Sequence, residues 1–157
     1  MNVIDTPPIT PEMPPNLLDY LRDGGPALLL TTGTDGYPSS AYTWAIALDG
    51  TRLRFGADEG GSGYANLERT GQAAIHIIGP NDLAFLVKGT ARLLKAHIDT
   101  ASPARMALYE LEVIGARDQS FPGVTAKPFT YEWPAAQRAA LTKMEQSVFT
   151  EMREFAQ

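Results

Sequence analysis

The 157-residue sequence contains no cysteine, which excludes disulfide bonds, thiol nucleophiles and zinc–thiolate sites. Basic residues are also scarce, since 13 lysines and arginines stand against 18 aspartates and glutamates, for a net charge of −5. Nucleic-acid binding requires a basic face, so this balance argues against a nucleic-acid partner. The sequence has no apolar run near the roughly 20 residues that a membrane-spanning helix requires, and we expect no membrane association.

The composition, 44% hydrophobic and 20% charged, is typical of a single globular domain with an ordinary core. The amino-terminal residues lack the basic and then apolar pattern of a secretory signal, so we expect a cytoplasmic protein. Five prolines between Pro7 and Pro15 remove backbone donors and fix φ. Residues 1–15 are therefore expected to form an extended arm, outside the packed core, that can lie across a neighbouring subunit.

Residues 27–57 are predicted to form an antiparallel meander. Asp35-Gly36 and Asp49-Gly50 separate three runs rich in apolar or β-branched residues. Asp-Gly favours type I′ hairpin turns, in which both central residues have positive φ. A short amphipathic helix is expected before the meander, from Asn16 to the glycines at 24–25. Three further strands are expected at residues 72–79, 83–96 and 105–118.

The middle strand of the meander alternates between large and small side chains. The large side chains on one face are Tyr42, Trp44, Ile46 and Leu48. The small side chains on the other face are Ser39, Ala41, Thr43, Ala45 and Ala47. The small face leaves room either for a flat ligand or for a neighbouring helix or sheet.

The stretch "GADEGGSGYANL", residues 56–67, places a glycine cluster between a strand and a short helix. It is neither a Walker A loop nor a dinucleotide fingerprint, since Asn66 stands at the third glycine position of the fingerprint. Converging N–H groups at a helix amino terminus can nevertheless bind an anion at Gly61, Ser62 and Gly63. The alternative is a turn in which Ser62 caps the helix and Gly71 ends it.

The carboxyl-terminal residues 134–157 are predicted to form an amphipathic helix that packs on the β domain or on a partner subunit. Its apolar stripe consists of Leu141, Met144, Val148, Met152 and Phe155. No metal site is expected, because neither His76 nor His97 has a second ligand at metal-binding spacing on the same element. Taken alone, Trp44 and Trp133 indicate core or interface positions more often than cofactor contacts.

The order of several short motifs between Pro26 and Leu94 resembles the pyridoxamine 5′-phosphate oxidase-like, FMN-binding split-barrel family. These motifs are "DGYP", "LRFGAD", "S-x-x-x-NL" and "V-x-G-x-A-x-L". The resemblance implies a mainly β fold, a six-stranded antiparallel Greek-key split barrel over residues 16–133, with a short amino-terminal helix and a long carboxyl-terminal helix. It also implies a homodimer that holds FMN in a cleft at the subunit interface.

By position, the resemblance places the flavin ring beside residues 41–46 and the phosphate at the glycine cluster. The oxidase itself directs four cations at the phosphate, and this sequence has Ala41, Ile46, Ser62 and Gly63 at those positions. Their absence argues against pyridoxamine phosphate oxidation and leaves Arg52, Arg54 or Lys88 as substitutes, although alternation can point Arg52 and Arg54 at solvent. The expected cofactor-binding residues are Tyr42, Thr43, Trp44, Arg54, Gly56, Ala57, Gly61, Ser62, Gly63 and Lys88.

The function expected from this resemblance is an FMN-dependent oxidoreductase acting on a small molecule, with no side chain identified as a catalytic acid or base. An alternative is a split-barrel dimer that has lost FMN and binds haem, a deazaflavin or a metabolite. A third, structural interpretation explains the glycines as turns and the carboxyl-terminal helix as a dimer clamp.

Overall fold

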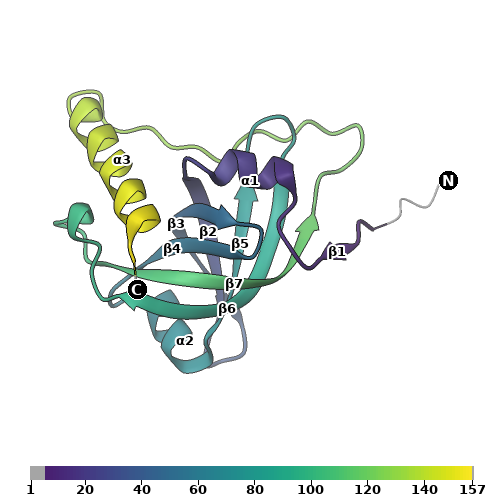
Figure 1. Ribbon diagram of the computed structural model, residues 1–157, viewed down its shortest axis with the longest axis horizontal. Coiled ribbons are helices and arrows are strands. Elements are labelled where there is room, and N and C mark those ends of the chain that lie inside the picture. The colour runs from purple at the N-terminus through teal and green to yellow at the C-terminus, as the bar shows by residue number, and fades with distance from the viewer. Residues whose placement is uncertain (1–5, 157) are drawn as a thin grey trace.

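The computed structural model describes residues 6–156, so the first five residues of the expected arm and Gln157 lie outside the described residues. Six antiparallel strands close into a barrel in the order β2-β3-β4-β7-β6-β5, with β5 returning to β2 (Figure 1). The strands are β2 Gly25–Thr32, β3 Pro38–Asp49, β4 Arg52–Asp58, β5 Gln72–Ile78, β6 Ala84–Lys95 and β7 Met106–Asp118. The predicted mainly β barrel is confirmed.

Within the described residues, three α-helices, one short 3-10 helix and one additional strand surround the barrel. They are β1 Ile9–Thr10, α1 Pro15–Leu21, α2 Ser62–Thr70, η1 Asp99–Ala101 and α3 Arg138–Glu154. Helices α1 and α2 lie at opposite ends of the barrel, and α3 lies beside it (Figure 1). Within residues 6–156, no helix is both long enough and apolar enough to cross a membrane.

The barrel interior is a continuous apolar core. Phe55, Leu29 and Ile75 are almost fully buried in it, and each comes from a different strand. Leu17 and Leu21 of α1 complete the core at one end, and Leu67 of α2 does so at the other.

The two predicted hairpins form, but the prediction of type I′ turns is wrong. Gly36 has φ 81°, whereas Asp35, Asp49 and Gly50 do not have positive φ. Aspartate side chains stabilise these turns instead: Tyr37 N–H donates to Asp35 Oδ1 over 3.0 Å, and Thr51 N–H donates to Asp49 Oδ1 over 2.9 Å. Asp therefore acts here through side-chain hydrogen bonds to the backbone rather than through its tolerance of positive φ.

The small face of β3 points into the barrel, so the alternative of a packed neighbour is the one the structure adopts. Ala45 and Ala47 are buried in the interior core together with large side chains from facing strands. The large residues Trp44 and Ile46 lie on the outer face of β3, against α3. Alanines on one strand make room for the bulky interior residues of the others, because interiors are filled to a fixed density.

The amino-terminal arm and α3 both pack on their own chain. Ile9 and Thr10 pair with Arg117 and Ala116 at the end of β7. Met13 is buried in the barrel core, so the expectation that residues 1–15 lie outside the packed core is wrong at this residue. On the outer face of the barrel, Val148, Phe149 and Met152 of α3 form a second core with residues of β3, β7 and η1. The buried apolar residues of both segments are therefore covered within the chain, whereas Ile9 of the arm stays 45% exposed.

The closing β6–β7 ladder allows a specific stability prediction at Gly89. A Cβ at this position would lie 2.0 Å from the backbone oxygen of Glu112, at a β-bulge between Lys88 and Gly89. Backbone cannot yield as a side chain does, so Gly89→Ala is expected to lower the free energy of unfolding by about 1–3 kcal/mol, measured by urea denaturation. Gly115→Ala is the matched control on β7, because the three atoms nearest to its Cβ belong to the side chains of Ile9 and Lys88, which can move. Equal losses in the two variants would contradict the argument.

Candidate functional site

An aromatic pocket of about 420 Å³ lies on the outer face of the barrel. Residues of β3, Pro26 of β2 and Met106 of β7 form one wall, and the segment at residues 129–133 forms the other. Its aromatic residues are Tyr42, Trp44, Phe129, Tyr131 and Trp133. Tyr42 stacks on Phe129 with ring centroids 5.4 Å apart and planes 8° apart, although Tyr42 itself is 75% exposed. Such a pocket suits a flat, largely apolar ring.

A chain of polar contacts connects this pocket to α3. The indole Nε1 of Trp44 donates to the hydroxyl of Tyr131 over 2.5 Å, and that hydroxyl donates to Glu145 of α3. Burial, followed by the hydrogen bond to Glu145, raises the pKa of Tyr131 above its ordinary value. The phenol therefore stays neutral at ordinary pH and remains a hydrogen-bond donor at the pocket wall.

Of three further predicted cofactor residues on β3 and β4, Thr43 and Gly56 lie at this pocket and Ala57 does not. Thr43 donates to the carbonyl of Gly56 over 2.6 Å and thereby ties the two strands together. A Cβ at Gly56 would lie 2.2 Å from the sulfur of Met106, so glycine leaves the space in which this lining residue sits. Ala57 faces the other way and is buried in the barrel core.

The predicted anion loop forms the amino terminus of α2. Gly61 is the N-cap, without a side-chain capping bond, so the expected capping by Ser62 is wrong. Ser62 is instead the first helical residue, and its hydroxyl lies 2.9 Å from that of Ser39 on β3. Gly63 is buried, and a Cβ at this position would lie 3.2 Å from Cδ2 of Leu29. Gly71 ends the helix with φ 62°, as predicted. The first-turn N–H groups are left without a side-chain acceptor at the cap.

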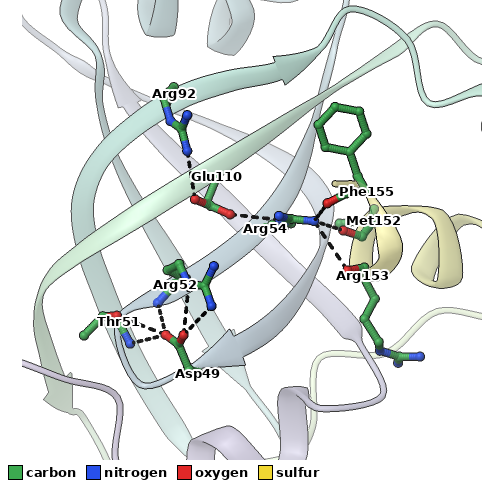
Figure 2. Close-up of polar contacts among 9 residues, drawn as sticks. All are labelled: Asp49, Thr51, Arg52, Arg54, Arg92, Glu110, Met152, Arg153 and Phe155. Atoms are coloured by element: carbon green, nitrogen blue, oxygen red, sulfur yellow. Dashed lines mark hydrogen bonds and ion pairs between the residues drawn. The ribbon is translucent and has the colours of Figure 1, made fainter. Parts of the chain in front are cut away.

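Arg54 is buried, at 5% exposure, and its contacts lie inside the chain. Its Nε donates to Glu110 over 2.9 Å, and its Nη1 donates to the carbonyls of Met152 and Phe155, each over 2.8 Å (Figure 2). The expectation that alternation points it at solvent is wrong, because α3 covers this part of the outer face; Arg52 does stay exposed. The guanidinium binds the carboxyl end of α3, and we do not propose it as a phosphate ligand.

Lys88 lies on β6, where it borders two hollows that share no lining residue with the aromatic pocket. A different cation, which sequence reasoning missed, reaches the loop before α2. Arg105 binds Glu59 over 2.8 Å, three residues ahead of Ser62. Its position just before β7 gives no local signal for this pairing, which depends on β4 and β7 being neighbours.

A family model described as pyridoxamine 5′-phosphate oxidase matches residues 13–132. The chain belongs to the pyridoxamine 5′-phosphate oxidase family. The match extends beyond the region of resemblance between Pro26 and Leu94 at both ends, and it includes most of the segment that closes the aromatic pocket. A search of curated protein sequences finds no significant match.

Solved structures share the fold of this member of the pyridoxamine 5′-phosphate oxidase family at low sequence identity. A candidate pyridoxamine 5′-phosphate oxidase from Lactobacillus delbrueckii is 17% identical over 71% of this chain and 98% of its own, with a TM-score of 0.57. A structure titled F420 reductase is 18% identical over 68% of this chain and 100% of its own, with a TM-score of 0.58. HupZ from Group A Streptococcus is 16% identical over 73% of this chain and 99% of its own, with a TM-score of 0.57.

The structure divides the predicted cofactor residues of this family member into groups. Tyr42, Thr43 and Trp44 line one pocket, with Gly56 behind its lining residue Met106. The glycine cluster lies at the α2 terminus, and Arg54, Ala57 and Lys88 lie elsewhere. Phe129 and Tyr131 are pocket residues that sequence reasoning missed, because residues 119–133 show no period that would place them on a face. It also missed Glu145 of α3, which lies outside the pocket and accepts the Tyr131 hydroxyl.

Proposed function

We propose that this chain binds FMN, with the flavin ring in the aromatic pocket and the phosphate at the amino terminus of α2, and acts as an oxidoreductase on a small molecule. The observation that carries the proposal is the arrangement of both features along β3. Trp44 lies in the pocket, and Ser39, five residues earlier, contacts Ser62 of α2. Five residues of strand span about 16 Å. Because Ser39 and Trp44 lie on opposite faces of β3, an extended ligand with a ring at one end and an anion at the other would pass around the edge of β3 before Ala45, where its ladder with β4 begins.

FMN would supply hydride or electron transfer, while the chain supplies binding and orientation. Ser39, Ser62 and the first-turn N–H groups of α2 would hold the phosphate, and Trp44, Tyr131 and their aromatic neighbours would hold the ring. The first test is the visible absorption spectrum of the purified protein, repeated after addition of FMN and desalting. Flavin bands that persist support the proposal, and complete loss of added FMN contradicts it.

Ser62→Arg is expected to strengthen FMN binding by about 10- to 100-fold, because a charge-assisted hydrogen bond to phosphate contributes about 1.5–3 kcal/mol. Riboflavin, which has the same ring and no phosphate, should bind this variant as it binds the wild type. Titration by flavin fluorescence measures both. Tighter binding of both ligands, or of neither, would place the phosphate away from α2.

A second candidate function is binding of another ligand, such as haem, a deazaflavin or a metabolite, without redox catalysis by the chain. The observation that favours it is the charge around Ser62. Asp58 and Glu59 immediately precede the glycine cluster, and Arg105 is paired with Glu59. A protein that releases FMN and takes up haem or a deazaflavin in the same spectral assay would favour this function.

We also propose that the protein is a cytoplasmic homodimer. Support comes from large apolar side chains that stay exposed on the barrel surface, among them Tyr42 at 75% and Ile114 at 62%. Covering such side chains is favourable in proportion to the apolar area removed from water. Multi-angle light scattering is expected to give twice the chain mass, and a monomer at micromolar concentration would contradict the dimer.

A further inference from the structure

A second cavity, of about 770 Å³, lies at the end of β7, away from the aromatic pocket. The amino-terminal arm at Thr6 and Pro7, the β5–β6 turn at Asp82, and the segment at residues 117–125 enclose it. It shares no lining residue with the aromatic pocket. The FMN site proposed above does not use this cavity.

Arg117 in this cavity has an unmet hydrogen-bonding requirement. Its Nε is buried and has no hydrogen-bond partner within residues 6–156. No carboxylate of the described chain forms an ion pair with its guanidinium either. Because Nε is inaccessible, a molecule in the cavity would bind the terminal nitrogens of this guanidinium, and the planar fork of an arginine matches a carboxylate in particular.

The charges around Arg117 select for a ligand with a single negative charge. Asp82 and Asp118 also line the cavity, and Lys88 borders an adjoining hollow together with Arg117. Each aspartate already accepts a backbone N–H: Asp82 Oδ1 from Ala126 and Asp118 Oδ1 from Ser120, both over 2.8 Å. The two carboxylates balance the two cations, so a dianion would meet repulsion that a monoanion with one arginine partner meets less strongly.

Part of the remaining cavity wall is apolar and accessible, beside the polar residues Thr6, Gln119, Ser120 and Thr125. Phe121 and Val124 are 57% and 55% exposed, and Pro7 and Pro122 lie in the same lining. Exposed apolar side chains around one cation match a ligand that carries an apolar body on its carboxylate. We infer that the cavity at the end of β7 binds a small monocarboxylate with an aliphatic or aromatic body, its carboxylate on Arg117 and its body on Phe121 and Val124.

The test is a ligand-observed NMR titration of the full chain with hexanoate, 1-hexanol and hexyl phosphate. At pH 8, where hexyl phosphate is a dianion and 1-hexanol is neutral, hexanoate is expected to bind saturably at millimolar concentration and the other two at least about tenfold more weakly, since each lacks the single charge that the site selects. Absence of saturable hexanoate binding, or equal binding of 1-hexanol, overturns the inference. Saturating FMN should leave hexanoate binding unchanged, and competition would overturn a separate site.

Variants assign the site to its residues. Arg117→Gln is expected to weaken hexanoate binding about tenfold. Arg105→Gln, which removes an exposed arginine at another place on the barrel, should leave binding unchanged. Phe121→Ala truncates an exposed side chain, so it tests the site even where Arg117→Gln does not fold, and it too should weaken binding. Wild-type affinity in the folded Arg117→Gln protein overturns the assignment, as does wild-type affinity in Phe121→Ala.

Discussion

Arg54→Met is expected to lower the free energy of unfolding by about 3–5 kcal/mol, because removing one partner of a buried ion pair leaves the other charge without compensation. Glu110 is buried, and its other ion-pair partner, Arg92, is largely exposed and so compensates its charge only weakly. The same substitution frees the carbonyls of Met152 and Phe155 at the carboxyl end of α3 (Figure 2). Urea denaturation followed by circular dichroism measures the loss.

Arg52→Met is the matched control, since Arg52 lies two residues away on the same strand and also pairs with an acid. Its partner Asp49 is 43% exposed and its own side chain 50% exposed, so a loss of at most about 1 kcal/mol is expected. The double variant Arg54→Met/Glu110→Leu should recover part of the stability, because it removes both buried charges. Equal effects of Arg52→Met and Arg54→Met would show that burial of the Arg54 pair contributes nothing.

Local patterns were sufficient to predict the elements of the barrel. Asp-Gly pairs marked both hairpins, and Gly71 marked the end of α2. A period of two identified which residues of β3 share a face, but it carries no information on which face is inside. That choice depends on the volume of residues such as Phe55 on other strands, so the small face could not be assigned to the barrel interior from β3 alone.

The site was predictable only where it lies on regular elements. Strand β3, which contains Trp44, could be placed by its family position. Tyr131 contacts Trp44 only through the folded chain, 87 residues farther along, and Glu145 in turn contacts Tyr131. Arg54 shows the same limit. It is buried by the end of a helix 98 residues away, a contact that strand alternation cannot anticipate.

Trp44→Ala is expected to weaken the binding of FMN and of riboflavin alike, by about 100-fold, because it removes the aromatic wall of the pocket to which we assign the flavin ring. The indole contacts Phe149 edge to face, with centroids 6.1 Å apart, and holds Tyr131 through Nε1. Loss of an aromatic side chain at the centre of a binding site typically costs about 2–4 kcal/mol. Fluorescence titration of each flavin gives the two dissociation constants.

Two further variants separate the ring contact from general damage. Tyr37→Ala removes an aromatic side chain that is 73% exposed and outside the pocket, so it should bind both flavins as the wild type does. Trp44→Phe keeps an aromatic wall but loses the hydrogen bond to Tyr131, and a loss of about 3- to 10-fold is expected, the equivalent of one ordinary hydrogen bond. Unchanged riboflavin affinity in a folded Trp44→Ala protein would show that the ring lies elsewhere, whereas a loss confined to FMN would place the phosphate, and not the ring, in this pocket.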